Sequence, residues 1–381
     1  MASSGVKEND GAAAKRARLW RLAAAALLGL TLLSLATAWT ELPPPPQQQQ
    51  QQQRLGAGGP AAAARTALAG PGLALDASLR GVAASDDFNR LKIAFAVTIT
   101  KDGKYLDGAA VLKHSVDMLG SAHDVSFVAI VHPSVTTTRP ALRELGIEIL
   151  EYPEPITSAE IQGKHLRETI DKSGCCGVLE LLKLRAFQLT AYDRVVLLDM
   201  DTLIVQSLDH LFDFPEEMLF TYDHAMDSGH SAAPPVQGGF MVLRPSVKTF
   251  ERLVDIVREG DFRPGSGWAG QNIGWCWGGQ TIQGLISYYY NRVDPDNKRV
   301  LDYCRYNAMV STKNCEETPI SEVISIHFTV CQKPWECRKL EKPLCNEMHA
   351  EWWKVRRNFE QAHGLPVSPP CKRRSDYRPL F

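Results

Sequence analysis

From Leu91 onwards, apolar residues come in short runs separated by segments with helical spacing. Continuous apolar runs predict buried strands, and apolar residues recurring every three or four positions predict helices. The expected strands are Ile93–Ile99, Val125–Val131, Ile147–Tyr152, Val195–Leu198 and Phe240–Leu243. The expected helices are Gly108–Leu119, Thr138–Leu145, Val247–Val257 and a helical run before Val195 with apolar Leu179, Leu182, Ala186 and Leu189. Strands alternating with helices favour an α/β fold with a parallel, doubly wound sheet.

The first 88 residues follow a different pattern. Leu22–Ala38 is a run of 17 residues without a charge, preceded by a basic cluster and flanked by Trp20 and Trp39. We interpret residues 1–21 as a cytoplasmic tail and 22–38 as a transmembrane signal-anchor, with the remainder translocated. A cleaved signal peptide is the main alternative, because Ala36–Ala38 fits an A-x-A site, and an organelle transit segment is another. Residues 39–88 are rich in Pro, Gln, Ala and Gly, which predicts a disordered stalk.

The composition of the whole chain is that of a globular protein. Its 381 residues carry a formal net charge of −1, which gives no electrostatic reason to expect a nucleic-acid partner. We expect the main domain at 89–345 and a helical, cysteine-containing extension at 346–381. Trp352 and Trp353, with Arg356 and Arg357, predict an amphipathic helix that caps the domain.

Nine cysteines are present, and six of them crowd the last fifth of the chain. None forms a C-x-x-C pair, so the pattern disfavours structural zinc and favours disulfides that staple a loop-rich C-terminal region. The pairing stays open, and the odd count leaves at least one thiol unpaired within the chain. The six are Cys304, Cys315, Cys331, Cys337, Cys345 and Cys371, with Cys175, Cys176 and Cys276 upstream.

The candidate chemistry centres on Asp199 and Asp201, which follow the apolar strand Val195–Leu198. Positions i and i+2 of extended backbone project to the same side, so the two carboxylates can lie together. The carboxyl end of a buried strand is where open α/β sheets bind ligands. Two hard oxygen donors there suit a divalent cation that also bridges a diphosphate. The pattern therefore indicates chemistry on a nucleotide-linked substrate.

Five separated blocks between Leu91 and Trp335 resemble the family 8 glycosyltransferases, the glycogenin-like enzymes of type A fold. They are Val97–Leu112, Lys183–Val205, Val236–Ser246, Gly278–Gln280 and Ile326–Trp335. The resemblance implies a Rossmann-like, mixed or parallel sheet flanked by helices.

The first and last blocks imply the nucleotide site. By resemblance, Tyr105 stacks on the uracil of a UDP-sugar, and Ile99 and Lys101 lie beside the base. A flat aromatic face suits a nucleobase. Lys333 is expected to hold the diphosphate. Val330 stands where the family has a glycine that approaches the phosphate.

The resemblance also implies a metal site. Asp199, Asp201 and His327 match the family's ligands. One imidazole and two carboxylates favour Mn²⁺, with Mg²⁺ as the alternative.

Five positions are expected near the donor sugar. Lys183 stands where the family keeps a basic residue, and Gln237 replaces an asparagine that contacts the sugar. Gly239 lies in the same block and is expected at the substrate. Gly279 replaces an acid that binds sugar hydroxyls, and Gln280 keeps the position nearest the anomeric carbon. Together, Lys183, Gln237 and Gln280 are the candidate catalytic residues.

These expectations describe a metal-dependent, retaining transfer of a hexosyl group to a carbohydrate or glycoprotein acceptor. An amide such as Gln280 is a poor nucleophile, so we favour same-face substitution through an oxocarbenium-like state. The predicted anchor and stalk place the enzyme in the Golgi membrane as a single-pass type II protein, or outside the cell if residues 22–38 are cleaved. A homodimer is one option for its assembly.

Three other functions compete with this interpretation. The departures at Gly279 and Val330 suggest a catalytically silent UDP-sugar binder. A glycogenin-like self-glucosylating primer is disfavoured by the predicted anchor. A haloacid-dehalogenase-type phosphatase also ends a strand on Asp-x-Asp. It expects Thr or Val two residues after the second acid, where this chain has Leu203, and no late acid pair follows.

Overall fold

A mixed seven-stranded sheet lies at the centre of the computed structural model, which describes residues 90–227, 229 and 231–381. The strand order is β10-β6-β7-β4-β1-β2-β3. The strands are β1 (Lys92–Ile99), β2 (Asp124–Val131), β3 (Glu148–Glu151), β4 (Arg194–Leu198), β6 (Met218–Tyr222), β7 (Val236–Leu243) and β10 (Lys298–Val300). Most neighbouring strands are parallel, but β7 runs antiparallel to both β4 and β6. The α/β prediction is confirmed, and the sheet is mixed rather than wholly parallel.

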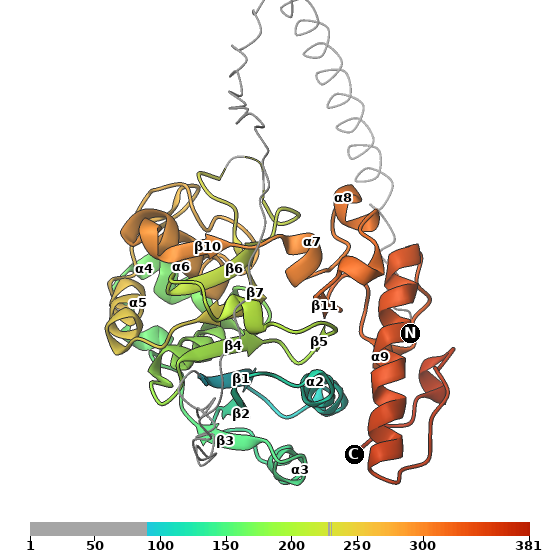
Figure 1. Ribbon diagram of the computed structural model, residues 1–381. Helices are drawn as coiled ribbons and strands as arrows, with labels where there is room; N and C mark the ends of the chain where they lie inside the picture. Colours follow the sequence, from blue (N-terminus) through green and yellow to red (C-terminus); the bar gives the residue numbers. More distant parts are fainter. Residues whose placement is uncertain (1–89, 228, 230) are drawn as a thin grey trace, which may run out of the picture. The chain divides into compact units, whose positions relative to one another are not determined.

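The apolar runs became strands because both faces of the sheet are covered. All five residues of β4 and all eight of β7 are buried, as expected for strands packed on both sides. The α-helices are α2 (Leu106–Leu119), α3 (Arg139–Glu144), α4 (Lys164–Thr169), α5 (Val247–Glu259), α6 (Ile282–Tyr288), α7 (Tyr303–Tyr306), α8 (Lys313–Glu316) and α9 (Pro343–Ala362). In Figure 1, α4, α5 and α6 lie to the left of the strands, and α2 and α9 lie to the right.

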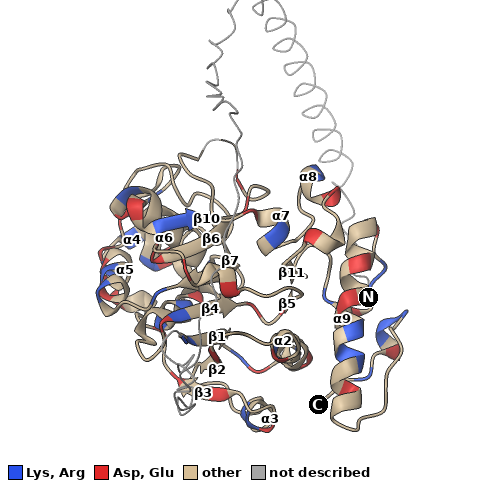
Figure 2. Cartoon of the chain, in the orientation of Figure 1, with Lys and Arg blue, Asp and Glu red and all other residues tan. Residues whose placement is uncertain are grey.

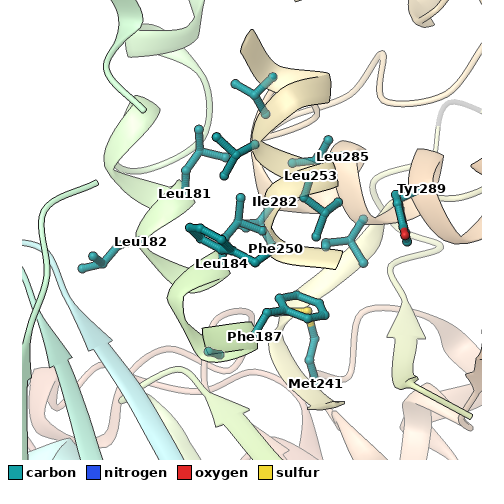
Figure 3. Close-up of a cluster of buried hydrophobic side chains, with 14 of the residues drawn as sticks. Leu181, Leu182, Leu184, Phe187, Met241, Phe250, Leu253, Ile282, Leu285 and Tyr289 are labelled. Atoms are coloured by element: carbon teal, nitrogen blue, oxygen red, sulfur yellow. The ribbon is translucent and has the colours of Figure 1, made fainter. Parts of the chain in front are cut away.

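The helical run before β4 is a 3₁₀ helix, η4 (Gly177–Gln188). Val178, Leu181, Leu184 and Phe187 are buried at every third position, which is the period of a 3₁₀ helix. The sequence predicted an α-helical spacing that included Leu179, but that residue is only partly buried. Figure 3 shows the apolar side chains of η4 among those of α5, α6 and β7. The side chains labelled there include Leu181, Leu184 and Phe187 of η4, Met241 of β7, Phe250 and Leu253 of α5, and Ile282 and Leu285 of α6.

The same period places two polar residues of η4 on one side. Glu180 and Lys183 are three residues apart, and residues i and i+3 of a 3₁₀ helix lie one above the other. Both side chains line a pocket at the carboxyl edge of the sheet. The 3₁₀ geometry therefore places one acidic and one basic side chain of the same helix, Glu180 and Lys183, in the pocket.

The C-terminal region packs against the side of the sheet that α2 covers. Helix α9 contacts α2 and buries both Trp352 and Trp353, which confirms the predicted amphipathic helix. Figure 2 shows acidic and basic residues interspersed along α9, with no surface of a single charge on that helix.

Three disulfides staple this region, as the cysteine pattern predicted. They join Cys304 to Cys315, Cys331 to Cys345, and Cys337 to Cys371. The remaining thiols, Cys175, Cys176 and Cys276, are unpaired.

The predicted tail, signal-anchor and stalk lie outside the described residues. Within residues 90–381, apart from 228 and 230, no helix has both the length and the apolar character needed to cross a bilayer.

Candidate functional site

Three central strands and a short outer strand bring the predicted site residues to one edge of the sheet. Strands β1 and β4 are parallel, with Val97 opposite Leu198, so their carboxyl ends meet. Strand β7 is antiparallel to β4, with Leu198 opposite Phe240, so its first residues lie at the same edge. A cavity of about 290 Å³ opens there. The site residues that line it are Lys101, Tyr105, Lys183, Asp199, Asp201, Gln237, His327 and Lys333.

The imidazole reaches this edge through a separate small sheet. Strand β11 (Ser325–His327) pairs antiparallel with β5 (Thr202–Ile204), and His327 lies opposite Thr202. The backbone N–H of Phe328 donates to the carbonyl of Asp201. His327 is thereby held beside the Asp-x-Asp turn despite its distance along the chain.

Asp199, Asp201 and His327 form a group suited to a divalent cation. One ligand atom from each lies within 4.8 Å of the others. The Nε2 atom of His327 is 3.5 Å from Asp201 Oδ1 and 3.9 Å from Asp199 Oδ2. Two carboxylates and an imidazole fit Mn²⁺ or Mg²⁺ by charge and donor type.

A buried amide orients the imidazole. Asn307 Oδ1 lies 3.0 Å from His327 Nδ1, and Asn307 Nδ2 donates to Thr221 Oγ1 at 3.0 Å. Because the amide nitrogen is directed at Thr221, its oxygen accepts from Nδ1–H. This assignment leaves Nε2 facing the carboxylates, as the ring nitrogen through which the imidazole can bind a metal.

Each carboxylate also has a lysine partner. Lys183 Nζ lies 2.7 Å from Asp199 Oδ1 and donates to the carbonyl of Gly238 at 2.9 Å. Lys333 Nζ lies 2.8 Å from Asp201 Oδ2. Two ammonium groups therefore face the two acids across the pocket.

These contacts shift the pKa values of the buried groups. Burial alone would lower the pKa of Lys183, but the Asp199 and Glu180 carboxylates outweigh it and raise that pKa. Burial likewise opposes the charge on Lys333, and Asp201 raises its pKa. Burial would raise the pKa of Asp201, but His327 and Lys333 hold it well below its ordinary value. Both lysines are positively charged and Asp201 is negatively charged at neutral pH.

The nucleotide loop is held by a carboxylate that sequence analysis did not single out. Asp102 accepts from the backbone N–H groups of Thr136 and Thr138, each at 2.9 Å, and from the hydroxyl of Thr138 at 2.8 Å. These bonds fix the loop that carries Lys101 and Tyr105. Tyr105 is 40% exposed, lines the pocket and makes a T-shaped contact with Trp335.

Four predicted site residues lie outside the lining of this pocket. Ile99 is a core residue at 2% exposure. Gly239 is buried, and a Cβ there would lie 2.4 Å from His327 Cε1, so glycine makes room for the imidazole. The side-chain amide of Gln280 donates to Thr169 Oγ1 at 2.8 Å in a neighbouring cavity of about 300 Å³.

Gly279 is the fourth, and its surroundings explain the missing acid. A Cβ on Gly279 would lie 1.7 Å from the carbonyl oxygen of Gly274. Gly279 also accepts the indole N–H of the buried Trp268 at 2.8 Å. No side chain fits at this position without a shift of the backbone. Val330, the other departure, is 39% exposed and lies outside the pocket lining.

Several residues that line the pocket or support its ligands were missed by sequence analysis. Glu180 looked like an ordinary helix residue, and the 3₁₀ period is the signal that would have found it. Cys175 and Cys176 were counted only as thiols. Asn307 follows no motif, and only the fold brings it to His327.

Comparison with known proteins gives consistent matches. Residues 96–232 match the family model described as Glycosyl transferase family 8. A putative UDP-glucuronate:xylan alpha-glucuronosyltransferase 3 of Arabidopsis thaliana is 23% identical over 277 residues, covering 69% of this chain and 40% of the relative. Glycogenin-1 of Homo sapiens is 28% identical over 196 residues, covering 51% of this chain and 52% of the relative.

Solved structures include a galactosyltransferase, LgtC, in complex with donor and acceptor sugar analogues. It aligns with a TM-score of 0.46 and 15% identity, over 72% of this chain and 98% of LgtC. This chain spans 40–42% of the length of the three Arabidopsis thaliana relatives with which it aligns.

Proposed function

We propose that this chain, whose residues 96–232 match the model of Glycosyl transferase family 8, transfers a hexosyl group from a UDP-sugar to a carbohydrate or glycoconjugate acceptor with retention of configuration. One observation carries the proposal. Asp199, Asp201 and His327 converge on one wall of a pocket that also presents Tyr105 and Lys333. This set can hold a nucleobase, a diphosphate and a divalent cation together.

The residues present fit a divalent cation, with Mn²⁺ as the proposed ion. Asp199, Asp201 and Nε2 of His327 would hold it. When bound, it supplies positive charge to the departing diphosphate. The Asn307 amide accepts from Nδ1–H and thereby keeps Nε2 aimed at the site.

The chain's own side chains position the donor. The ring of Tyr105 stacks on the uracil, and Lys101 lies beside it. Lys333, a cation in the apo site, stabilises negative charge on the leaving diphosphate in the transition state. Lys183 remains tied to Gly238 and Asp199 and fixes the side of the pocket next to Gln237.

The pocket favours same-face substitution over a covalent intermediate. Asp199 and Asp201 are paired with lysines, and Glu180 Oε1 accepts from Cys175. No carboxylate lining the described pocket is left uncompensated as a nucleophile. The acceptor hydroxyl therefore attacks from the face that the diphosphate leaves.

A panel of UDP-sugars tests the proposal. The full chain is incubated with Mn²⁺ and UDP-glucose, UDP-galactose, UDP-N-acetylglucosamine or UDP-glucuronate, and UDP release is measured with and without chelator. We expect metal-dependent release with at least one donor and none from Asp201→Ala. Donor binding without turnover would identify a silent binder instead, and activity that survives chelation would overturn the metal's role.

Intact-mass measurement after incubation with UDP-glucose separates transfer to an external acceptor from self-glucosylation. We expect no mass increase on the chain itself. A ladder of added hexoses would assign the primer function instead.

We also propose a Golgi location with the catalytic domain in the lumen. The three C-terminal disulfides support an oxidising compartment, and residues 22–38 supply the proposed anchor. Protease protection of a C-terminally tagged full chain in intact microsomes tests it. Cleavage of the tag without detergent would contradict a lumenal domain.

A further inference from the structure

A second group of potential metal ligands lies on the wall of the donor pocket. Cys175, Cys176 and Glu180 each offer one ligand atom, and these atoms lie within 4.8 Å of one another. Cys175 Sγ is 2.6 Å from Cys176 Sγ and 2.9 Å from Glu180 Oε1. The group combines two sulfur donors with one oxygen donor. None of these residues belongs to the Asp199, Asp201 and His327 group.

The backbone around the two thiols is closely fitted. Gly174 and Gly177 flank them with φ values of 65° and 59°, a left-handed conformation that glycine adopts without strain. A Cβ on Gly177 would lie 2.6 Å from the carbonyl oxygen of Asp171. The turn directs both cysteines toward Glu180, which begins the second turn of η4.

Outer polar groups hold two of the three candidate ligands. The buried hydroxyl of Thr281 lies 3.1 Å from Glu180 Oε2 and 3.0 Å from the carbonyl oxygen of Gly278. The hydroxyl of Thr100 lies 3.8 Å from Cys176 Sγ. Protein metal sites commonly orient their ligands with such outer contacts.

The chemistry of this donor set selects a soft cation. Thiolates favour Zn²⁺ and related ions over Mn²⁺ and Mg²⁺, and a carboxylate oxygen is also a common zinc ligand. The cysteines are adjacent, so the C-x-x-C spacing that marks many zinc sites is absent.

We propose that Cys175, Cys176 and Glu180 bind one Zn²⁺ ion, with the fourth coordination position facing the donor pocket. Binding displaces the two thiol protons to solvent. Tetrahedral Zn–S bonds near 2.3 Å set the sulfur atoms about 3.8 Å apart, which is wider than the 2.6 Å between them without the ion, so binding requires the two side chains to rotate apart. The site is chemically distinct from the Mn²⁺ site, and its metal binding can be measured without the proposed transfer reaction.

Cadmium titration of the chelator-stripped full chain tests the site, with the three disulfides intact, Cys175 and Cys176 as free thiols, and Mn²⁺ present throughout. Cd²⁺ bound to thiolates gives an ultraviolet charge-transfer band. We expect one equivalent of Cd²⁺ to produce the band and Zn²⁺ to displace it. Cys175→Ser and Cys176→Ser should each lose the band, so that no Cd²⁺ at this site remains for Zn²⁺ to displace. Glu180→Gln should keep the band but bind more weakly, and Thr281→Val should weaken binding about 10- to 100-fold.

Two control variants separate this site from others. Cys276→Ser removes an unpaired thiol outside the group and should leave the band unchanged. Asp201→Ala removes a ligand of the proposed Mn²⁺ site and should also leave the Cd²⁺ band unchanged. Failure of the transferase proposal can therefore be distinguished from failure of the zinc proposal. Absence of the band in the wild-type chain with its disulfides intact, or its persistence in both single-cysteine variants, would overturn the proposal. If the cysteine variants do not fold, undiminished binding by Glu180→Gln would overturn it.

Discussion

Gly239 and His327 are in such close contact that a single methyl group on Gly239 would collide with the imidazole. A Cβ built there lies 2.4 Å from Cε1 and 2.7 Å from Nδ1 of His327. Strand β7 therefore needs glycine at this position so that the imidazole of β11 can face the two aspartates. The glycine acts on the metal site by leaving room for a proposed ligand rather than by supplying one.

Gly239→Ala should displace His327 and weaken Mn²⁺ binding by about 10- to 100-fold, the range for residues that orient metal ligands. Gly238→Ala is the matched control, because the nearest atoms to its new Cβ lie at 3.4 Å. Calorimetric titration with Mn²⁺ measures both variants. Equal affinities for Gly239→Ala and Gly238→Ala would show that the imidazole tolerates the displacement.

Asn307→Ala should also weaken Mn²⁺ binding, for a different reason. The variant removes the acceptor that holds the proton on Nδ1 of His327, so the imidazole loses both its orientation and its fixed tautomer. We expect a loss of about 10- to 100-fold in affinity. Thr221→Val, which removes only the contact to Asn307 Nδ2, should show a smaller loss. A loss for Thr221→Val that exceeds that for Asn307→Ala would contradict this order of effects.

Lys333→Met should separate metal binding from catalysis. Removing the ammonium that pairs with Asp201 eliminates a competitor for the carboxylate, so Mn²⁺ should bind at least as tightly as in the wild type. The diphosphate loses a charge partner in the transition state, and kcat should fall about 100-fold. Lys104→Met, an exposed lysine outside the pocket lining, should change neither quantity. A parallel loss of metal affinity and kcat in Lys333→Met would assign this lysine to the metal site alone.

The parts of the site that could be predicted from sequence are those fixed by strand ends. Asp199 and Asp201 directly follow an apolar run that predicts a buried strand, so their position at the edge of the sheet follows from the local sequence pattern. His327 and Lys333 came from the family resemblance, because no local rule pairs β11 with β5.

The rest depended on close packing that a linear pattern does not encode. Gln280 and Gly279 sit in a loop whose course is set by contact between Gly274, Gly279 and Gly284. The sequence predicted both at the donor sugar, but the loop directs Gln280 to Thr169. The 3₁₀ character of η4, which brings Glu180 to the pocket, was hidden because 3₁₀ and α-helical patterns overlap over few turns.

Asp102→Asn should change how stability depends on pH in acid. Backbone N–H groups of Thr136 and Thr138 hold the pKa of Asp102 below its ordinary value of 3.8. A lowered folded-state pKa stabilises the fold above the unfolded-state pKa, and this contribution is lost as the pH falls below 3.8 toward the folded-state pKa. The stability difference between wild type and Asp102→Asn should therefore shrink on acidification. Urea unfolding at neutral pH and below 3.8 measures it, and a constant difference would rule out the linkage.

Arg356→Ala should destabilise the fold more than Arg357→Ala, the other change proposed for α9. Arg356 is 1% exposed, and its guanidinium lies 2.9 Å from Glu360 Oε1 and 3.4 Å from Asp107 Oδ2. The Asp107 carboxylate also accepts hydrogen bonds from the Tyr377 hydroxyl and from the backbone N–H of Leu380. Burial raises the pKa of Asp107 despite these partners, so the carboxylate depends on the arginine to stay charged.

Removing one partner of a buried ion pair leaves uncompensated charge, which costs about 3–5 kcal/mol. Arg357→Ala, on the partly exposed side of the same helix, should stay within about 0.5 kcal/mol of wild type. Urea unfolding without reductant keeps the three disulfides intact and measures both variants. Because α9 packs on α2, which begins directly after Tyr105, Arg356→Ala should also weaken UDP binding. Wild-type stability in Arg356→Ala would mean that Asp107 and Glu360 are neutralised by protonation, and the variant's stability would then fall as the pH rises.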